Sequence, residues 1–435
     1  MISKLLYKVK NNKQYLNSFW SLIGSVLPKL GVFITSILLA RILEADRFGD
    51  LSIVRSTINM FTIFAASGIG ITATKFISEH YNENFKNENK VAEIISLVNF
   101  VSLVLGIIIS LGIIIFSNQL SEIVIGKKDL RNDLIIGAMM LLFNALNAAQ
   151  IGIIAGFQKY KTIAINSTLA IFISLPFQVL GAIYFEIEGA LFGFAINFLL
   201  LYLFNKYSIY KLTKGFKIKL LDFRKNYKIL YQFTLPSSLS GLMVMPITWV
   251  TTVLLTRSIN GSFNLGIFEA ANQIKMVIIF IPIALSNVLL PTLMEKNSDK
   301  NDLNNTIKNN LLLNISISLI ICLVICLFSR LIMSLFGQQF KDYYLTLIIL
   351  SISTVFMAAN NVIGQIIASK DKMWIGFLFN FLWGMTLILS SYIFIYHYKL
   401  GALSLALAYL VSYLLHTFWQ FAYLKLKYEN NNNIT

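Results

Sequence analysis

Long apolar stretches follow one another along almost the whole chain and are separated by short polar turns. Each is about 20 residues or longer, the length that an α-helix needs to cross a hydrocarbon core of about 30 Å. A barrel would instead show short segments with alternating polarity, so the pattern favours helices. It predicts an all-α integral membrane protein. We place twelve spans at 15–40, 48–75, 92–116, 133–157, 162–185, 189–210, 229–256, 264–293, 308–329, 343–368, 373–396 and 400–424.

The second half of the chain repeats features of the first. The residues at 39–41, 48–49, 154–159 and 188–191 have counterparts at 255–257, 265–266, 367–372 and 400–403. Six spans per half is an even number, so both repeats enter the membrane with the same polarity and form parallel repeats. We therefore expect two six-helix lobes around a central cavity. The predicted parts are an N-lobe (1–210), a basic cytoplasmic linker (211–228), a C-lobe (229–427) and a disordered tail (428–435).

Charge determines the predicted orientation. Only 13% of the residues are charged, about half the share of a soluble protein, yet the net charge is +16. Of the 36 lysines and arginines, 24 fall in the segments that lie inside if the N-terminus is inside, 9 fall in outer segments and 3 lie within spans. The positive-inside rule then places both termini in the cytoplasm. The basic excess is a topology signal and does not indicate a nucleic-acid partner.

The turn after the first span resembles a known family. The stretch RILEADRFG (41–49) has an arginine at the span's outer end, a short acidic turn and an aromatic-Gly pair. Together with the small-Gly-Phe-Gln-Lys-Tyr stretch at 155–160, the twelve spans and the basic central loop, it resembles the Wzx-type O-antigen and polysaccharide flippases. These belong to the superfamily that also holds multidrug-and-toxin extruders and the lipid II flippase. Ala45 departs from that family, which often has proline in this turn.

The resemblance implies a function in envelope synthesis. Such a protein moves undecaprenyl-diphosphate-linked oligosaccharide repeat units across the bacterial inner membrane by alternating access, for O-antigen and lipopolysaccharide. Its partners would be this lipid-linked substrate, membrane lipids, and the polymerase and chain-length proteins of the pathway. No catalytic chemistry and no cofactor are implied.

Charged residues inside the spans are the candidate substrate site. A cation at the centre of a membrane helix costs roughly 2.5–3.5 kcal/mol, so it usually faces protein or water. Lysine and arginine match the concentrated negative charge of a diphosphate through charge-assisted hydrogen bonds. Asparagines one helical turn away would share a polar face with the cations. The predicted substrate-binding residues are Lys29, Arg55, Asn59, Asn272 and Lys275.

Glu269 is the one carboxylate that lies away from the ends of the predicted spans, and its role is open. It could form an ion pair with Arg55 or Lys275, because charges inside membranes commonly pair. A desolvated carboxylate could also bind H⁺ or Na⁺ and couple transport to an ion gradient.

Amides and prolines recur at equivalent places in the two halves. Span four carries Asn144, Asn147 and Gln150, and the equivalent stretch of span ten carries Asn360, Asn361 and Gln365. These amides could contact sugar hydroxyls or pack helices together, and both interpretations stay open. Pro28 and Pro246 lie in the first span of each half. Since proline removes a helical hydrogen bond, both are candidate hinges.

Several other functions lack support in the sequence. Cys322 and Cys326 lie one turn apart on a predicted membrane helix, a spacing that suits neither a structural disulfide nor a complete metal site. The sequence holds no P-loop, HExxH or GxSxG motif, so we expect no metal and no enzyme activity. A multidrug/cation antiporter of the same fold is the first alternative, although it would favour acidic residues where Lys29 and Arg55 stand. An O-antigen polymerase is the second, and it would need a long outer loop.

Overall fold

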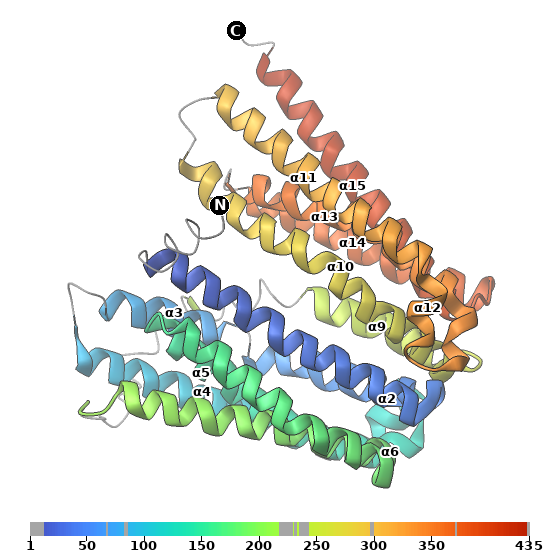
Figure 1. Ribbon diagram of the computed structural model, residues 1–435, viewed down its shortest axis with the longest axis horizontal. Helices are drawn as coiled ribbons and strands as arrows, with labels where there is room; N and C mark the ends of the chain where they lie inside the picture. The colour runs from blue at the N-terminus through green and yellow to red at the C-terminus, as the bar shows by residue number, and fades with distance from the viewer. Residues whose placement is uncertain are drawn as a thin grey trace. The chain divides into compact units, whose positions relative to one another are not determined.

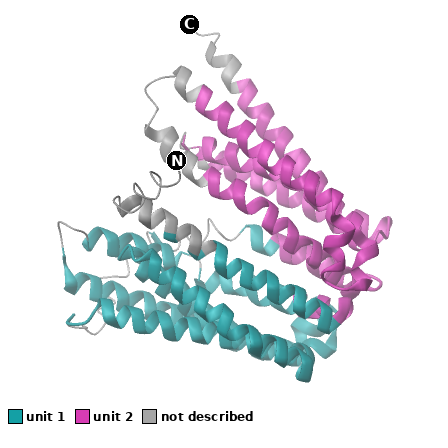
Figure 2. Ribbon diagram, viewed as in Figure 1, with its two compact units in different colours: residues 1–43, 53–246 teal, residues 44–52, 247–435 magenta. Residues whose placement is uncertain are grey.

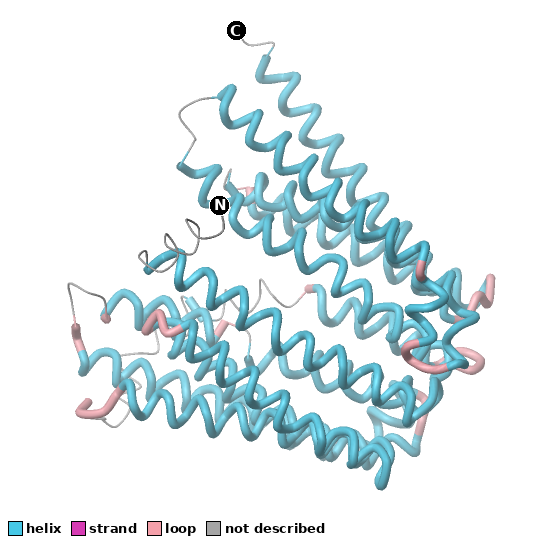
Figure 3. Tube along the Cα trace, viewed as in Figure 1, coloured by secondary structure: helices cyan, strands magenta, loops and turns pink. Residues whose placement is uncertain are grey.

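The chain folds almost entirely into helices (Figure 3). The computed structural model describes residues 13–66, 68–81, 86–216, 229, 233–234, 243–295, 300–369 and 372–432. Within these ranges the β-structure is limited to one isolated bridge between Tyr81 and Lys86. The predicted all-α membrane class is confirmed.

The helices follow the predicted spans closely (Figure 1). The α-helices are α2 (Lys13–Ala66), α3 (Ile69–His80), α4 (Glu88–Ile115), α5 (Arg131–Gly156), α6 (Tyr160–Leu212), α9 (Val244–Thr256), α10 (Gly261–Glu295), α11 (Lys300–Leu327), α12 (Ser329–Ser334), α13 (Tyr344–Ser369), α14 (Met373–Tyr392) and α15 (Ala402–Asn432). Short π- and 3₁₀-helices lie beside them: η1 (Gln119–Ile125), η2 (Lys128–Leu130), η4 (Gln338–Tyr343) and η5 (Ile393–His397).

Twelve spans can be counted in the described part of the chain. Nine helical stretches there are long and apolar enough to cross a membrane. Two of them contain a break, at Glu44 (φ 59°, ψ 176°) in α2 and at Phe185–Glu186 in α6. Each of these two therefore holds a pair of spans, and the shorter α9 completes the set. Both breaks lie where the polar turns of the sequence interrupt apolar runs.

The chain divides into two compact units (Figure 2). Unit 1 comprises residues 1–43 and 53–246, and unit 2 comprises residues 44–52 and 247–435. In unit 1, α5 packs against α3, α4 and α6. In unit 2, α13 packs against α10, α11 and α15. These two helices are the fourth span of each repeat, and more than half of the most apolar window in each is buried.

Residues 44–52 follow the first span in sequence but pack with unit 2. Their contact with α10 is close, because a Cβ atom on Gly49 would lie 1.8 Å from the Ser262 carbonyl oxygen. A Cβ atom on Gly266 would likewise lie 2.0 Å from the Ala45 carbonyl oxygen. Only glycine allows two backbones to approach this closely. Asp50, which is buried, accepts a hydrogen bond from the Ser262 hydroxyl and fixes the register of the two segments.

The unit limits differ from the predicted lobe limits at the start of the second half. Residues 229–246 group with unit 1. The described contacts there explain this grouping: Thr234 bonds the Thr72 hydroxyl at 2.8 Å, and the Phe233 ring lies 5.5 Å from that of Phe76. Most of the predicted linker 211–228 lies outside the described residues.

Two further features differ from the sequence prediction. α15 continues to Asn432, into the tail 428–435 that we predicted to be disordered. No glycine or proline interrupts residues 402–432, so the last membrane helix can extend past the apolar region. The predicted second span is divided near Gly68 (φ 77°), where α3 begins.

Candidate functional site

Arg55 lies in unit 1, on the part of α2 that follows the Glu44 break. Its guanidinium carbon lies 4.1 Å from the centre of the Phe194 ring, which belongs to the second half of α6. Phe194 is buried and Arg55 is half-buried. A cation at this distance over an aromatic face is attracted by the ring quadrupole. The ring therefore holds the guanidinium without supplying a hydrogen-bond acceptor.

The other predicted site residues of unit 1 lie on the same long helix. Asn59, one turn beyond Arg55, is exposed. Lys29 is also exposed and follows the half-buried Pro28 on the part of α2 before the break. Thr62 is buried and donates its hydroxyl hydrogen to the Ile58 carbonyl, so it is committed to its own helix.

Lys275 lies in unit 2, on α10, and its side chain is only 2% exposed. Its ammonium nitrogen lies 4.1 Å from the centre of the Tyr409 ring on α15. Among the described contacts it forms neither a hydrogen bond nor an ion pair, although Glu269 acts on its charge through space. A desolvated ammonium without an acceptor carries a free-energy cost.

The ring under Lys275 belongs to an aromatic cluster. Tyr409 stacks on Phe268 at 5.8 Å between centroids and lies 6.2 Å from Tyr413. Tyr413 lies 5.4 Å from Trp383 on α14. The sequence analysis assigned no role to these aromatic residues. Their signal was the spacing of Tyr409 and Tyr413, four residues apart on one face of span twelve.

Glu269 bonds to amides on its own helix. Its carboxylate accepts hydrogen bonds from Asn272 Nδ2 at 3.1 Å and from Gln273 Nε2 at 2.7 Å. Both the ion-pair and the coupling interpretation of Glu269 stay predictions. The side-chain oxygen of Asn272 is buried and has no hydrogen-bond partner among the described residues.

The two cation–aromatic contacts are related by the internal repeat. With the alignment of Gly49 to Gly266, Arg55 corresponds to Asn272, and Lys275 follows one turn later. With the alignment of Gly189 to Gly401, Phe194 corresponds to Ala406, and Tyr409 follows one turn later. In each unit, therefore, a cation of the second span lies over a ring of the sixth span. In unit 2 both the cation and the ring lie one helical turn further along their helices than in unit 1.

The equivalent amides of α5 and α13 make equivalent contacts. Asn147 Nδ2 donates to the Phe198 carbonyl at 2.9 Å, and Asn360 Nδ2 donates to the Tyr413 carbonyl at 3.5 Å. Asn360 Oδ1 also accepts from the Thr417 hydroxyl at 2.9 Å. These bonds join the fourth span of a unit to its sixth, which supports the packing interpretation for both asparagines.

The remaining predicted residues have less definite surroundings. Buried atoms of Gln150 and Asn361 lack hydrogen-bond partners in the described part of the chain. Pro246 lies in the first turn of α9.

The two cysteines of the chain lie close together: the sulfur atoms of Cys322 and Cys326 are 3.9 Å apart. No group of three metal-ligating side chains is found among the residues searched.

The fold is similar to that of several solved transporter structures. The chain is 15% identical to a multidrug resistance MATE family transporter of the MOP superfamily in an inward-facing conformation, with a TM-score of 0.74 over 93% of this chain and 98% of that one. It is 16% identical to the outward-facing conformation of such a transporter, with a TM-score of 0.69 over 96% of each chain. It is also 16% identical to a MOP superfamily transporter from Pyrococcus furiosus, with a TM-score of 0.68 over 96% of this chain and 97% of that one. A search of curated proteins finds no match.

The chain shares the fold of these solved structures, and its apolar helices define a multi-pass membrane protein. A family model described as "Polysaccharide biosynthesis protein" matches residues 16–297. Because this match covers well over half of the chain, the protein belongs to that family.

Proposed function

We propose that this protein flips a lipid-diphosphate-linked oligosaccharide repeat unit across the bacterial inner membrane by alternating access. The observation that carries the proposal is the pair of cation–aromatic contacts, Arg55 over Phe194 and Lys275 over Tyr409. An aromatic face positions a cation without removing its charge. Arginine and lysine match the concentrated negative charge of a diphosphate through charge-assisted hydrogen bonds, so both side chains are candidates for contact with the substrate.

Membership of a polysaccharide biosynthesis family supports a lipid-linked saccharide as the substrate. In such a molecule the diphosphate is the part that is hardest to bring into a membrane, because it carries concentrated charge. Positive potential along the path lowers that barrier. We assign Lys29 and Arg55 to this role in unit 1, and Lys275 with Asn272 in unit 2.

A multidrug/cation antiporter is the competing function, because several structural relatives carry that description. A cationic substrate needs carboxylates, whereas the predicted site of unit 1 carries Lys29 and Arg55. One relative is described by the reverse polarity of its binding pocket and a different function. This precedent supports reading the sign of the charge as an indication of the substrate.

We further propose that Glu269 couples transport to an H⁺ or Na⁺ gradient. Its two amide donors hold the carboxylate in place on α10. Lys275 lies on the same helix, and its charge interacts with that of the Glu269 carboxylate. The polymerase and chain-length proteins of the same pathway remain proposed partners.

The test is complementation of a strain that lacks its flippase, with surface glycan as the readout. We expect Arg55→Ala and Lys275→Ala to lower surface glycan by about tenfold or more, since each removes a charge-assisted contact with the diphosphate. Arg55→Lys keeps the charge and should restore part of the activity. Tyr409→Phe keeps the ring and should retain activity, while Tyr409→Leu removes it and should not.

The matched control is Lys206→Ala. Lys206 also lies near an aromatic ring, that of Tyr202 at 5.6 Å, but it is exposed near the end of α6. We expect it to keep full glycan display. If the Arg55 and Lys275 variants insert normally and also display full glycan, the cations do not bind the substrate and the proposal fails. If these variants keep surface glycan but lose resistance to drugs, the result would favour the antiporter function.

A further inference from the structure

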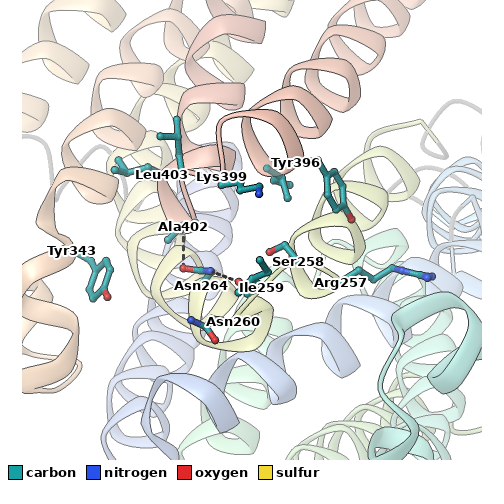
Figure 4. A pocket seen from close by; sticks show the side chains of 13 residues that line it. Arg257, Ser258, Ile259, Asn260, Asn264, Tyr343, Tyr396, Lys399, Ala402 and Leu403 are labelled. Carbon is teal, nitrogen blue, oxygen red and sulfur yellow. Dashed lines mark hydrogen bonds between the residues drawn. The ribbon is translucent and has the colours of Figure 1, made fainter.

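A pocket lies at the end of unit 2 where α10 and α15 begin, and Lys275 is not part of its lining (Figure 4). Its volume is about 490 Å³, within the range of ligand sites in proteins. Its walls come from the connection 257–260 between α9 and α10 with Asn264 of α10, and from the segment 395–403, which runs from η5 into the start of α15. Tyr343 completes the lining. The positive-inside count predicts that this end faces out of the cell.

The walls of this pocket are fixed by one asparagine. Asn264 Oδ1 accepts a hydrogen bond from the backbone N–H of Ala402 at 3.2 Å, and its Nδ2 donates to the Ile259 carbonyl at 3.1 Å. Figure 4 shows both bonds at the centre of the pocket. Gly401 is required beside it, since a Cβ atom there would lie 2.7 Å from Asn264 Oδ1. The pocket is therefore built by the fold itself.

The charged residues that line the pocket are all basic. It includes Arg257 and Lys399 and no acidic side chain. Lys399 is exposed and forms no hydrogen bond or ion pair with the described residues. Its backbone has φ 53°, a left-handed conformation that is unfavourable for lysine and is often found at functional sites.

The equivalent turns in the first half of the chain differ at the residues with positive φ. Such residues mark the corresponding connections in both halves. In the first half they are Glu44 and Glu186, whereas in the second half they are Asn260 and Lys399. The backbone feature and the arginine at 41 and 257 are thus shared by the repeats, whereas Lys399 replaces an acidic residue of the first half.

We propose that this pocket binds a saccharide that carries an anionic group, either a carboxylate or a phosphate. Lys399 is placed to pair with the anion. Tyr343 and Tyr396 are 39% and 37% exposed and offer aromatic surface to sugar rings. Asn260 adds an exposed amide for hydroxyl groups. This site is separate from the flipping function and does not depend on it.

The experiment measures binding to the purified, full-length protein in nanodiscs by calorimetry. The probes are a galacturonate tetramer, the neutral maltotetraose of equal length, and inorganic pyrophosphate. We expect the anionic probes to bind at least about tenfold more tightly than maltotetraose. Comparison of galacturonate with pyrophosphate identifies the carboxylate or the phosphate as the preferred anion.

Variants at Lys399 test whether the anionic probes bind in this pocket. Lys399→Asn removes the charge while asparagine tolerates the left-handed backbone, and we expect about a tenfold loss of affinity for the preferred anion. Lys399→Arg should bind within about twofold of the parent. Lys341→Asn, which removes a cation of the same unit outside the lining, should have no effect. Unchanged melting temperatures show that each variant is folded.

Three results would overturn the inference: no binding of either anionic probe, equal binding of maltotetraose, or full affinity in Lys399→Asn. None of them bears on surface glycan in the complementation test. Loss of the pocket proposal and loss of the flipping proposal are therefore distinguishable.

Discussion

Lys275 is a buried cation of unit 2, and its desolvation carries an electrostatic cost. Its ammonium is 2% exposed and lies over the Tyr409 ring without a hydrogen-bond acceptor. Replacing buried charged groups by apolar side chains of similar size is often neutral or stabilising, because desolvation exceeds what the contacts return. If Lys275 binds the substrate as proposed, the protein has a lower free energy of unfolding because this functional residue is buried.

We therefore expect Lys275→Met to raise the free energy of unfolding by about 1 kcal/mol or more while transport falls. Thermal unfolding of the purified protein, beside the glycan assay, measures both effects. Lys206→Met, at an exposed site, should change stability by less than about 0.5 kcal/mol. A lower melting temperature for Lys275→Met would mean that the ammonium stabilises the fold. That result would contradict the expectation that Lys275 lowers stability.

The sequence identified the cations of the candidate site but not their neighbours. Arg55 and Lys275 stand out because charge is rare in apolar runs. Phe194 and Tyr409 do not, because aromatic residues are common throughout the chain and their contacts depend on how the sixth span packs against the second. The charge of Lys399 was visible in the sequence, but its place in a pocket was not, since the pocket joins two connections more than 130 residues apart.

At the scale of elements, the contact between residues 44–52 and α10 is the most sterically demanding feature of unit 2. Gly49 and Gly266 are equivalent in the repeat, and each faces a carbonyl oxygen of the other segment. Phe48 adds an edge-to-face contact with Phe340, with centroids 6.5 Å apart. The hydroxyl bond from Ser262 to Asp50 completes the contact.

A single methyl group should disrupt this contact. In Gly49→Ala the new Cβ would lie 1.8 Å from a backbone oxygen, so the two segments must separate. We expect a loss of about 1–3 kcal/mol or more, measured as a lower melting temperature. Gly364→Ala on α13 is the matched control, because nothing lies within 4 Å of its added Cβ. Higher helix propensity should make that control neutral or up to about 1 kcal/mol more stable. Equal melting temperatures for the two variants would contradict the close packing.

The spans were predictable because about 20 consecutive apolar residues leave few other structures open to the chain. The turns at Glu44 and Glu186 were predictable for the same reason, since polar residues interrupt the apolar runs there. The membership of residues 44–52 in unit 2 was not predictable. It rests on a glycine contact between segments more than 200 residues apart, which neither periodicity nor composition reports.

For the whole molecule, orientation in the membrane follows from the distribution of charge and can be tested directly. Replacing Cys322 and Cys326 by alanine removes both cysteines of the chain. A single cysteine can then be placed at Lys399, in the connection before α15, or at Lys206, near the end of α6. Both positions are exposed, so a thiol reagent that cannot cross membranes should reach whichever one faces it.

We expect Lys399→Cys to be labelled in intact cells and Lys206→Cys only after the membrane is opened, because 24 of the 36 cations lie in the segments that share the side of Lys206. This result places the N-terminus in the cytoplasm, and the even number of spans places the C-terminus there too. It also sets the pocket around Lys399 on the outer face, to which the proposed transport would deliver saccharides. The reverse labelling would put that pocket in the cytoplasm, where it would meet substrate before transport, and would leave the charge distribution of this chain without a topological explanation.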